Sequence, residues 1–118
     1  MRAIGVFLAG LMAISATPTT IHVTATAYCE QGKTQSGTQA RTGIVAADPR
    51  VFPVGTVLRI LDGPHSGVYT VMDTGAAVKG HRIDIFIPDC ARAGAFGEKP
   101  LRVQIIRRGW NPKSTGDQ

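Results

Sequence analysis

Residues 71–87 read Val-Met-Asp-Thr-Gly-Ala-Ala-Val-Lys-Gly-His-Arg-Ile-Asp-Ile-Phe-Ile, and the fold we expect is built around this stretch. It holds two of the chain's eight acidic residues, Asp73 and Asp84, each inside or at the edge of an apolar, β-like run. A carboxylate in such a run is costly to bury unless other groups bind it. The two aspartates therefore need a structural or a chemical reason.

The sequence on both sides of this stretch predicts more strands. Alternation of apolar and polar residues, with many β-branched side chains, favours strands at residues 21–28, 43–47, 57–61, 67–72, 82–87 and 101–107. One short helix is expected at residues 90–95, because Pro88 and Asp89 suit a helix start and Gly97 a helix end. About six strands and one helix predict a mainly β protein, folded as a small closed or nearly closed barrel, which also removes exposed strand edges.

The 118 residues suffice for one domain with one modest core. We place that domain at residues 21–109, followed by a polar tail at 110–118. Residues 30–42 are polar and predict a long surface loop, either a binding rim for sugar hydroxyls or a solvated connection. Trp110 could line such a rim or pack on the barrel end, and we favour packing.

The first sixteen residues resemble a secretory signal peptide. Arg2 supplies the positive charge, residues 3–14 form an apolar run, and small residues allow cleavage after Ser15 or Ala16. An uncleaved anchor or a buried N-terminal helix is the alternative, although the run is short for a membrane span. We therefore expect a periplasmic or secreted protein without stable membrane insertion once the signal is cleaved.

The two cysteines fit an oxidising compartment. An even pair in a small exported domain forms a disulfide more often than two free thiols, so we expect Cys29 and Cys90 to be bonded. Neither belongs to a C-x-x-C or a Cys/His motif, and we predict no metal site and no cofactor.

A formal net charge of +5 raises the question of a polyanionic partner. The basic residues are scattered and lack the interleaved aromatic residues of single-strand binders, which argues against nucleic acid. A polyanionic cell wall suits an exported protein better, and simple solubility is an equally good explanation of the charge.

A family resemblance connects these features. The segments that carry it are Thr26-Ala27-Tyr28, Gly43-Ile44-Val45-Ala46-Ala47-Asp48-Pro49, Pro53-Val54-Gly55-Thr56, Asp73-Thr74-Gly75, Lys79-Gly80, Arg82-Ile83-Asp84-Ile85-Phe86 and Gly97. In this order they resemble the 3D domain, a family named for three aspartates, here matched by Asp48, Asp73 and Asp84. Read alone, Asp48 before Pro49 is an ordinary turn opener.

The resemblance implies a six-stranded double-psi β-barrel similar to the catalytic barrel of membrane-bound lytic transglycosylase A and to rare lipoprotein A. It implies cleavage of peptidoglycan glycan strands between N-acetylmuramic acid and N-acetylglucosamine, with 1,6-anhydro ends as products. We expect the protein to be a monomer. By position Asp84 would be the catalytic acid, with Asp73 and Asp48 beside it. Residues implied to bind substrate are Tyr28, Thr74, Gly75, Lys79 and Arg82.

One acid can suffice for this chemistry. When the sugar's own C6 hydroxyl is the nucleophile, a single carboxyl group can protonate the glycosidic oxygen and later accept the hydroxyl proton. Such an acid needs a raised pKa, which burial or a neighbouring Asp73 would give and Arg82 or Lys79 would oppose.

Three other interpretations remain open at this level. The barrel could bind peptidoglycan or another polysaccharide without cleaving it. The aspartates could be a polar network that ties strand ends to turns. Residues 71–76 also resemble the active-site segment of aspartic proteases, and residues 105–107 are weakly similar to a later apolar strand of those enzymes. Only about 30 residues separate the two segments, which is too few for a protease half-site.

Overall fold

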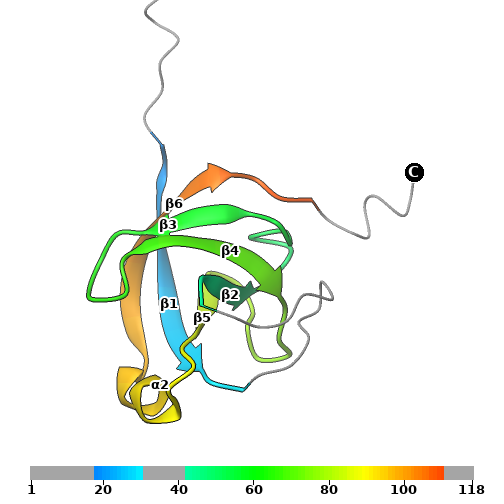
Figure 1. The fold of residues 1–118 in the computed structure, drawn as a ribbon. Helices are drawn as coiled ribbons and strands as arrows, with labels where there is room; N and C mark the ends of the chain where they lie inside the picture. The colour runs from blue at the N-terminus through cyan, green and yellow to red at the C-terminus, as the bar shows by residue number, and fades with distance from the viewer. Residues whose placement is uncertain (1–17, 31–41, 111–118) are drawn as a thin grey trace, which may run out of the picture.

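The computed structural model describes residues 18–30 and 42–110 (Figure 1). Their strands and helix are β1 (Thr20–Tyr28), β2 (Ile44–Ala47), β3 (Val57–Ile60), β4 (Gly67–Asp73), β5 (Arg82–Phe86), α2 (Cys90–Phe96) and β6 (Lys99–Arg107). Every one of them begins and ends within two residues of the predicted bounds. The mainly β fold with one short helix is therefore confirmed for the part of the chain that the structure describes.

The six strands close into one barrel in the order β1-β5-β2-β4-β3-β6. The pairs β1–β5 and β2–β4 are parallel, and the other neighbours are antiparallel. In this order only β3 and β4 are both consecutive in the chain and hydrogen-bonded to each other. The barrel is thus held by pairings between distant segments, and Asp73-Thr74-Gly75 lies at the end of a barrel strand and not in a protease half-site.

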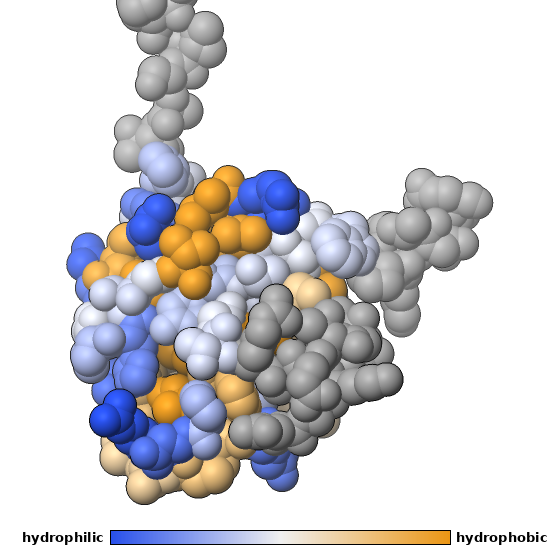
Figure 2. Space-filling view, viewed as in Figure 1, coloured by the Kyte–Doolittle hydropathy of each residue, from blue (hydrophilic) through white to orange (hydrophobic). Residues whose placement is uncertain are grey.

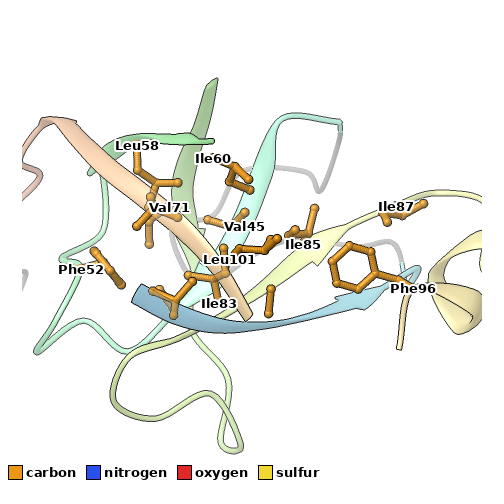
Figure 3. Packing of buried hydrophobic residues seen from close by; sticks show 14 of the residues in the cluster. Val45, Phe52, Leu58, Ile60, Val71, Ile83, Ile85, Ile87, Phe96 and Leu101 are labelled. Atoms are coloured by element: carbon orange, nitrogen blue, oxygen red, sulfur yellow. The ribbon is translucent and has the colours of Figure 1, made fainter. Parts of the chain in front are cut away.

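Alternate residues of the strands fill the barrel interior (Figure 3). The most deeply buried side chains of this core include Phe52, Leu58, Ile60, Val71, Ile83 and Ile85. Because side chains alternate along a strand, Asp84 between Ile83 and Ile85 must lie on the outer side of the barrel wall. The same core that stabilises the barrel thus fixes the direction of this carboxylate.

The helix α2 closes one end of the barrel (Figure 1). Asp89 caps its first turn by accepting hydrogen bonds from the backbone N–H groups of Ala91 and Arg92, at 2.9 and 3.2 Å. Gly97 ends it with a φ of 70°, a left-handed conformation that favours glycine. The predicted disulfide is present between Cys29, after β1, and Cys90, the first residue of α2.

Trp110 packs on the barrel, as favoured from the sequence. Its backbone N–H donates to the carbonyl of Val54 at 2.8 Å, and its ring lies against Gly55, where a Cβ atom would overlap the indole. The side chain is nevertheless 51% exposed. Val68 on β4 and Ile106 on β6 are also exposed, and Figure 2 shows apolar surface interspersed with polar groups over the barrel.

Several predictions concern residues outside the described ranges. They are the signal peptide at 1–16, most of the loop at 30–42 and nearly all of the tail at 110–118. Across residues 18–30 and 42–110, no helix has the length and the hydropathy of a membrane-spanning segment.

Replacing both bonded cysteines, by Cys29→Ser and Cys90→Ser together, tests how much this link stabilises the barrel. The bond closes a loop with a sequence separation of 61 residues. In the chain-entropy model, opening a loop of that length lowers the free energy of unfolding by about 4 kcal/mol. Urea unfolding followed by circular dichroism measures the difference, and an unchanged midpoint would show that the bond does not contribute to stability.

Candidate active site on the outer wall of the barrel

Two predicted site residues lie in one row across the barrel wall. In the strand register Thr26 of β1 is opposite Asp84 of β5, Asp84 is opposite Ala46 of β2, and Ala46 is opposite Asp73 of β4. With one strand between them, the Cα atoms of Asp84 and Asp73 are separated by roughly 10 Å, two interstrand spacings. The small apolar side chain of Ala46 lies between the two carboxylates, so the row has an acidic residue on each side of this alanine.

A bulge in β4 brings Asp73 into this row. Val45 is opposite Val71, but the next residue, Ala46, is opposite Asp73, so Met72 is an extra residue in β4. Val71 points into the core, and without the extra residue Asp73 would share its direction. The bulge therefore turns the Asp73 side chain toward the outer wall, the side on which Asp84 lies.

Asp84 occupies the environment expected of a proton donor. Burial raises the pKa of its carboxyl group above the ordinary 3.8, and the nearby negative charge of Asp73 raises it further. The hydroxyl of Thr26, which donates to Asp84 Oδ1 at 2.9 Å, and the charge of Arg82 oppose this shift without cancelling it. Since Oδ1 accepts the hydrogen bond, the proton of the neutral acid belongs on Oδ2.

Tyr28 adds a hydroxyl group to the two carboxylates. Its ring packs against Phe86 with centroids 5.4 Å apart. Burial, then the charges of Asp73 and Asp84, raises the pKa of Tyr28 to about 12, so the phenol keeps its proton. The hydroxyl oxygen is buried and has no hydrogen-bond partner. A buried donor without an acceptor costs free energy, and a bound ligand that accepts a hydrogen bond from this hydroxyl group would recover that cost.

Asp48 lies in a different environment from the other two aspartates. It is 1% exposed, and its carboxylate accepts hydrogen bonds from the Arg50 side chain, from the Arg50 backbone N–H and from the Gly80 backbone N–H. These donors, the Arg50 side chain foremost, hold the pKa of Asp48 well below its usual range. Asp48 is thus a permanently ionised anchor that fixes the turn before β5, which matches the polar-network interpretation.

The other residues expected to bind substrate lie around this row, some in β5 and some in the turn before it. Arg82 lies two residues before Asp84 in β5 and pairs with Glu98 at 3.4 Å. Thr74 donates its backbone N–H to Asp73 Oδ1 at 2.9 Å, and Gly75 accepts from Val78 in the turn that follows. Lys79 is exposed on that turn. Tyr28, Asp73 and Asp84 therefore form the centre, and the turn at 74–80 lies beside it.

Thr26 is the site residue that the sequence prediction missed. It belongs to the quoted Thr26-Ala27-Tyr28 segment, and strand alternation puts Thr26 and Tyr28 on one side of β1. What the sequence does not give is the parallel pairing of β1 with β5, which brings Thr26 to an aspartate 58 positions away.

The described residues contain no group of three or more histidine, cysteine, aspartate or glutamate side chains that could hold a metal ion.

Comparison with known proteins identifies a family and relatives. The family model of the 3D domain matches residues 43–107. The chain is 37% identical over 94 residues to the cell wall-binding protein YocH of Bacillus subtilis. The matched region covers 71% of this chain and 31% of that protein. It is 32% identical over 87 residues to the putative cell wall shaping protein YabE of the same organism, covering 69% and 21% respectively. The chain thus spans about a third or less of these two relatives.

The fold also resembles a solved structure. The superposition on Escherichia coli MltA with bound chitohexaose gives a TM-score of 0.55 at 24% sequence identity, covering 64% of this chain and 28% of that one. MltA is described as a lytic transglycosylase. At this level of identity the likeness concerns the fold, and it identifies the closed barrel as the double-psi type predicted from the sequence.

Substituting Asp73 tests the electrostatic link across the row. We expect Asp73→Asn to lower the pKa of Asp84 toward its ordinary value, because the substitution removes a negative charge that opposes ionisation. Carboxyl-detected NMR titration measures this pKa directly. As the matched control, Asp62→Asn removes a carboxylate that pairs with Arg102 at 2.7 Å and should leave Asp84 unchanged.

The same titration has a consequence for stability. Asp84 binds its proton more tightly in the folded than in the unfolded chain. Its contribution to stability is therefore lost as the pH rises from the pKa of Asp84 in the unfolded chain through its pKa in the folded chain. An Asp84 that titrates at or below its ordinary pKa in the unsubstituted protein would contradict this description of the site.

Proposed function

Because the chain belongs to the 3D domain family, we propose that it is a lytic transglycosylase of peptidoglycan. It would cleave the bond between N-acetylmuramic acid and N-acetylglucosamine and leave a 1,6-anhydro end. The observation that carries the proposal is a half-buried aspartic acid, Asp84, whose pKa is raised beside a second carboxylate. The cell-wall names of the two Bacillus subtilis relatives support the substrate class.

The proposed reaction uses Asp84 twice. The neutral acid first donates its Oδ2 proton to the glycosidic oxygen, whose bond to the anomeric carbon of the muramic acid breaks. The C6 hydroxyl of the same sugar then attacks that carbon and gives its proton to Asp84, which restores the neutral acid. No water enters, so no second carboxylate is needed to activate one.

The surrounding residues have separate parts in this proposal. The carboxylate of Asp73 raises the pKa of Asp84 and stabilises the positive charge that develops on the sugar ring. The buried hydroxyl of Tyr28 donates to the bound sugar. Arg82, Lys79, Thr74 and Gly75 border the path of the glycan. Asp48 acts as a positioning residue, because its bond to Gly80 fixes the turn that leads into β5.

We place the reaction outside the cytoplasm. The Cys29–Cys90 disulfide supports this location, since such bonds persist in oxidising compartments and are rare in the cytosol. Peptidoglycan is found in the same compartment.

Binding without cleavage is the second candidate function. This function is favoured by one relative, which is named a cell wall-binding protein. The match with that relative covers 71% of this chain. A binder would use the same outer wall of the barrel but would not depend on a proton at Asp84.

Digestion of purified peptidoglycan separates the two functions. We expect the intact protein to release muropeptides with 1,6-anhydro ends, identified by mass spectrometry, and Asp84→Asn to lower that rate by about a hundredfold or more, as loss of a general acid does. Asp89→Asn makes the same chemical change at the cap of α2, where asparagine caps as well as aspartate, and should retain full activity.

The products decide among the alternatives. Reducing ends instead of anhydro ends would identify a hydrolase, and sedimentation with peptidoglycan without release of fragments would identify a binder. Full activity of a folded Asp84→Asn variant would refute the assignment of Asp84 as the acid.

Tyr28→Phe tests the unpartnered hydroxyl. The substitution removes only an oxygen that has no hydrogen-bond partner in the free protein. We expect the free energy of unfolding to rise by about 1 kcal/mol, because the substitution removes a buried donor that has no acceptor, whereas the rate of anhydro-end formation falls about tenfold through loss of one hydrogen bond to the sugar. Equal rates for the two proteins would remove Tyr28 from the substrate contacts.

A further inference from the structure

A concave site lies between α2 and the turn that joins β3 to β4. This cavity has a volume of about 330 Å³ and is lined by Pro64, His65, Arg92, Ala95, Phe96 and Lys99. Its volume falls within the range of small-molecule sites. None of these residues belongs to the row of Thr26, Asp84 and Asp73, so the cavity is separate from the candidate active site.

The aromatic ring of Phe96 organises the basic side chains of the cavity. Phe96 is 8% exposed and anchored in the core, so its ring is a fixed floor. The Lys99 ammonium lies over that ring, 4.2 Å from the centroid, and the His65 ring meets it edge-on at 5.6 Å. Cation–π attraction of this kind holds the ammonium at the cavity without neutralising its charge.

The positive charge of the cavity has little compensation from the protein. No carboxylate lines it, and no acidic side chain of the described residues pairs with Lys99. Arg92 forms an ion pair with Asp89, in which Nε and Oδ2 are 3.9 Å apart, so Lys99 is the cation of the cavity that has no carboxylate partner among the described residues. Lys99 is only partly exposed, and a partly desolvated cation without a counterion favours the binding of an anion.

We propose that this cavity binds an oxyanion, a phosphate or carboxylate group, of a ligand whose apolar part rests on Phe96. Lys99 and Arg92 would donate charge-assisted hydrogen bonds to the anionic oxygens, the strongest kind available on a protein surface. Pro64 and Ala95 supply apolar contacts beside them. Such a site is a second point of attachment for an anionic ligand, independent of catalysis.

NMR titration of the intact protein with inorganic phosphate and, separately, with acetate at constant ionic strength tests the proposal. We expect amide and ring shifts concentrated at His65, Phe96 and Lys99. Lys99→Gln should weaken phosphate binding about tenfold, the loss expected for one hydrogen bond to a charged group, and Lys99→Arg should restore it. Arg59→Gln removes an equal charge from an exposed position on β3 and serves as the matched control.

The two anions also identify the source of the natural ligand. Localised shifts with phosphate alone indicate a phosphate ester, with acetate alone a peptide carboxylate, and with both a general oxyanion site; each result supports the proposal. Shifts spread evenly over the surface, no shifts, or equal loss in the Arg59→Gln variant overturn it. No glycan is present in this assay, so its outcome does not depend on whether Asp84 is catalytic.

Discussion

The strand β5 imposes the constraint on which the rest of the structure depends. Ile83 and Ile85 are at most 1% exposed and fill the barrel, while β1 and β2 hydrogen-bond to the two edges of the strand. Because both neighbouring strands and the two inward-facing isoleucines are fixed, the side chain of Asp84 can point only to the outer side of the barrel wall. Asp84 is therefore held beside Thr26 and Ala46, and its partial burial follows from the packing that closes the barrel.

The three aspartates show how environment gives one residue type different properties. Asp48 accepts bonds from a guanidinium and two backbone N–H groups, which stabilise its charged form. Asp84 accepts one hydroxyl bond and is partly withdrawn from water near another carboxylate, which favours its neutral form. In this chain the surroundings of Asp48 thus favour its charged form, whereas those of Asp84 favour its neutral form, with Asp73 on the other side of β2.

The sequence predicted the strands well because alternation is a local property, and the core residues of β5 follow from it directly. It could not predict which strands are neighbours. The pairings of β1 with β5 and of β2 with β4 join segments far apart in the chain, and no local pattern encodes them. The Met72 bulge and the Thr26 contact both depend on that pairing. The family motif places Asp48 in the catalytic group, which stays a prediction, and its contacts with Arg50 and Gly80 are those of a residue that orders a turn.

We propose that a glycan strand crosses the barrel wall over the row of Thr26, Asp84, Ala46 and Asp73. A crystal structure of the Asp84→Asn variant with a bound peptidoglycan oligosaccharide tests this placement. A glycosidic oxygen should lie within hydrogen-bond distance of the residue 84 side chain, and a sugar hydroxyl should be bonded to Tyr28. An oligosaccharide bound elsewhere on the barrel, with this row still in contact with solvent, would contradict it.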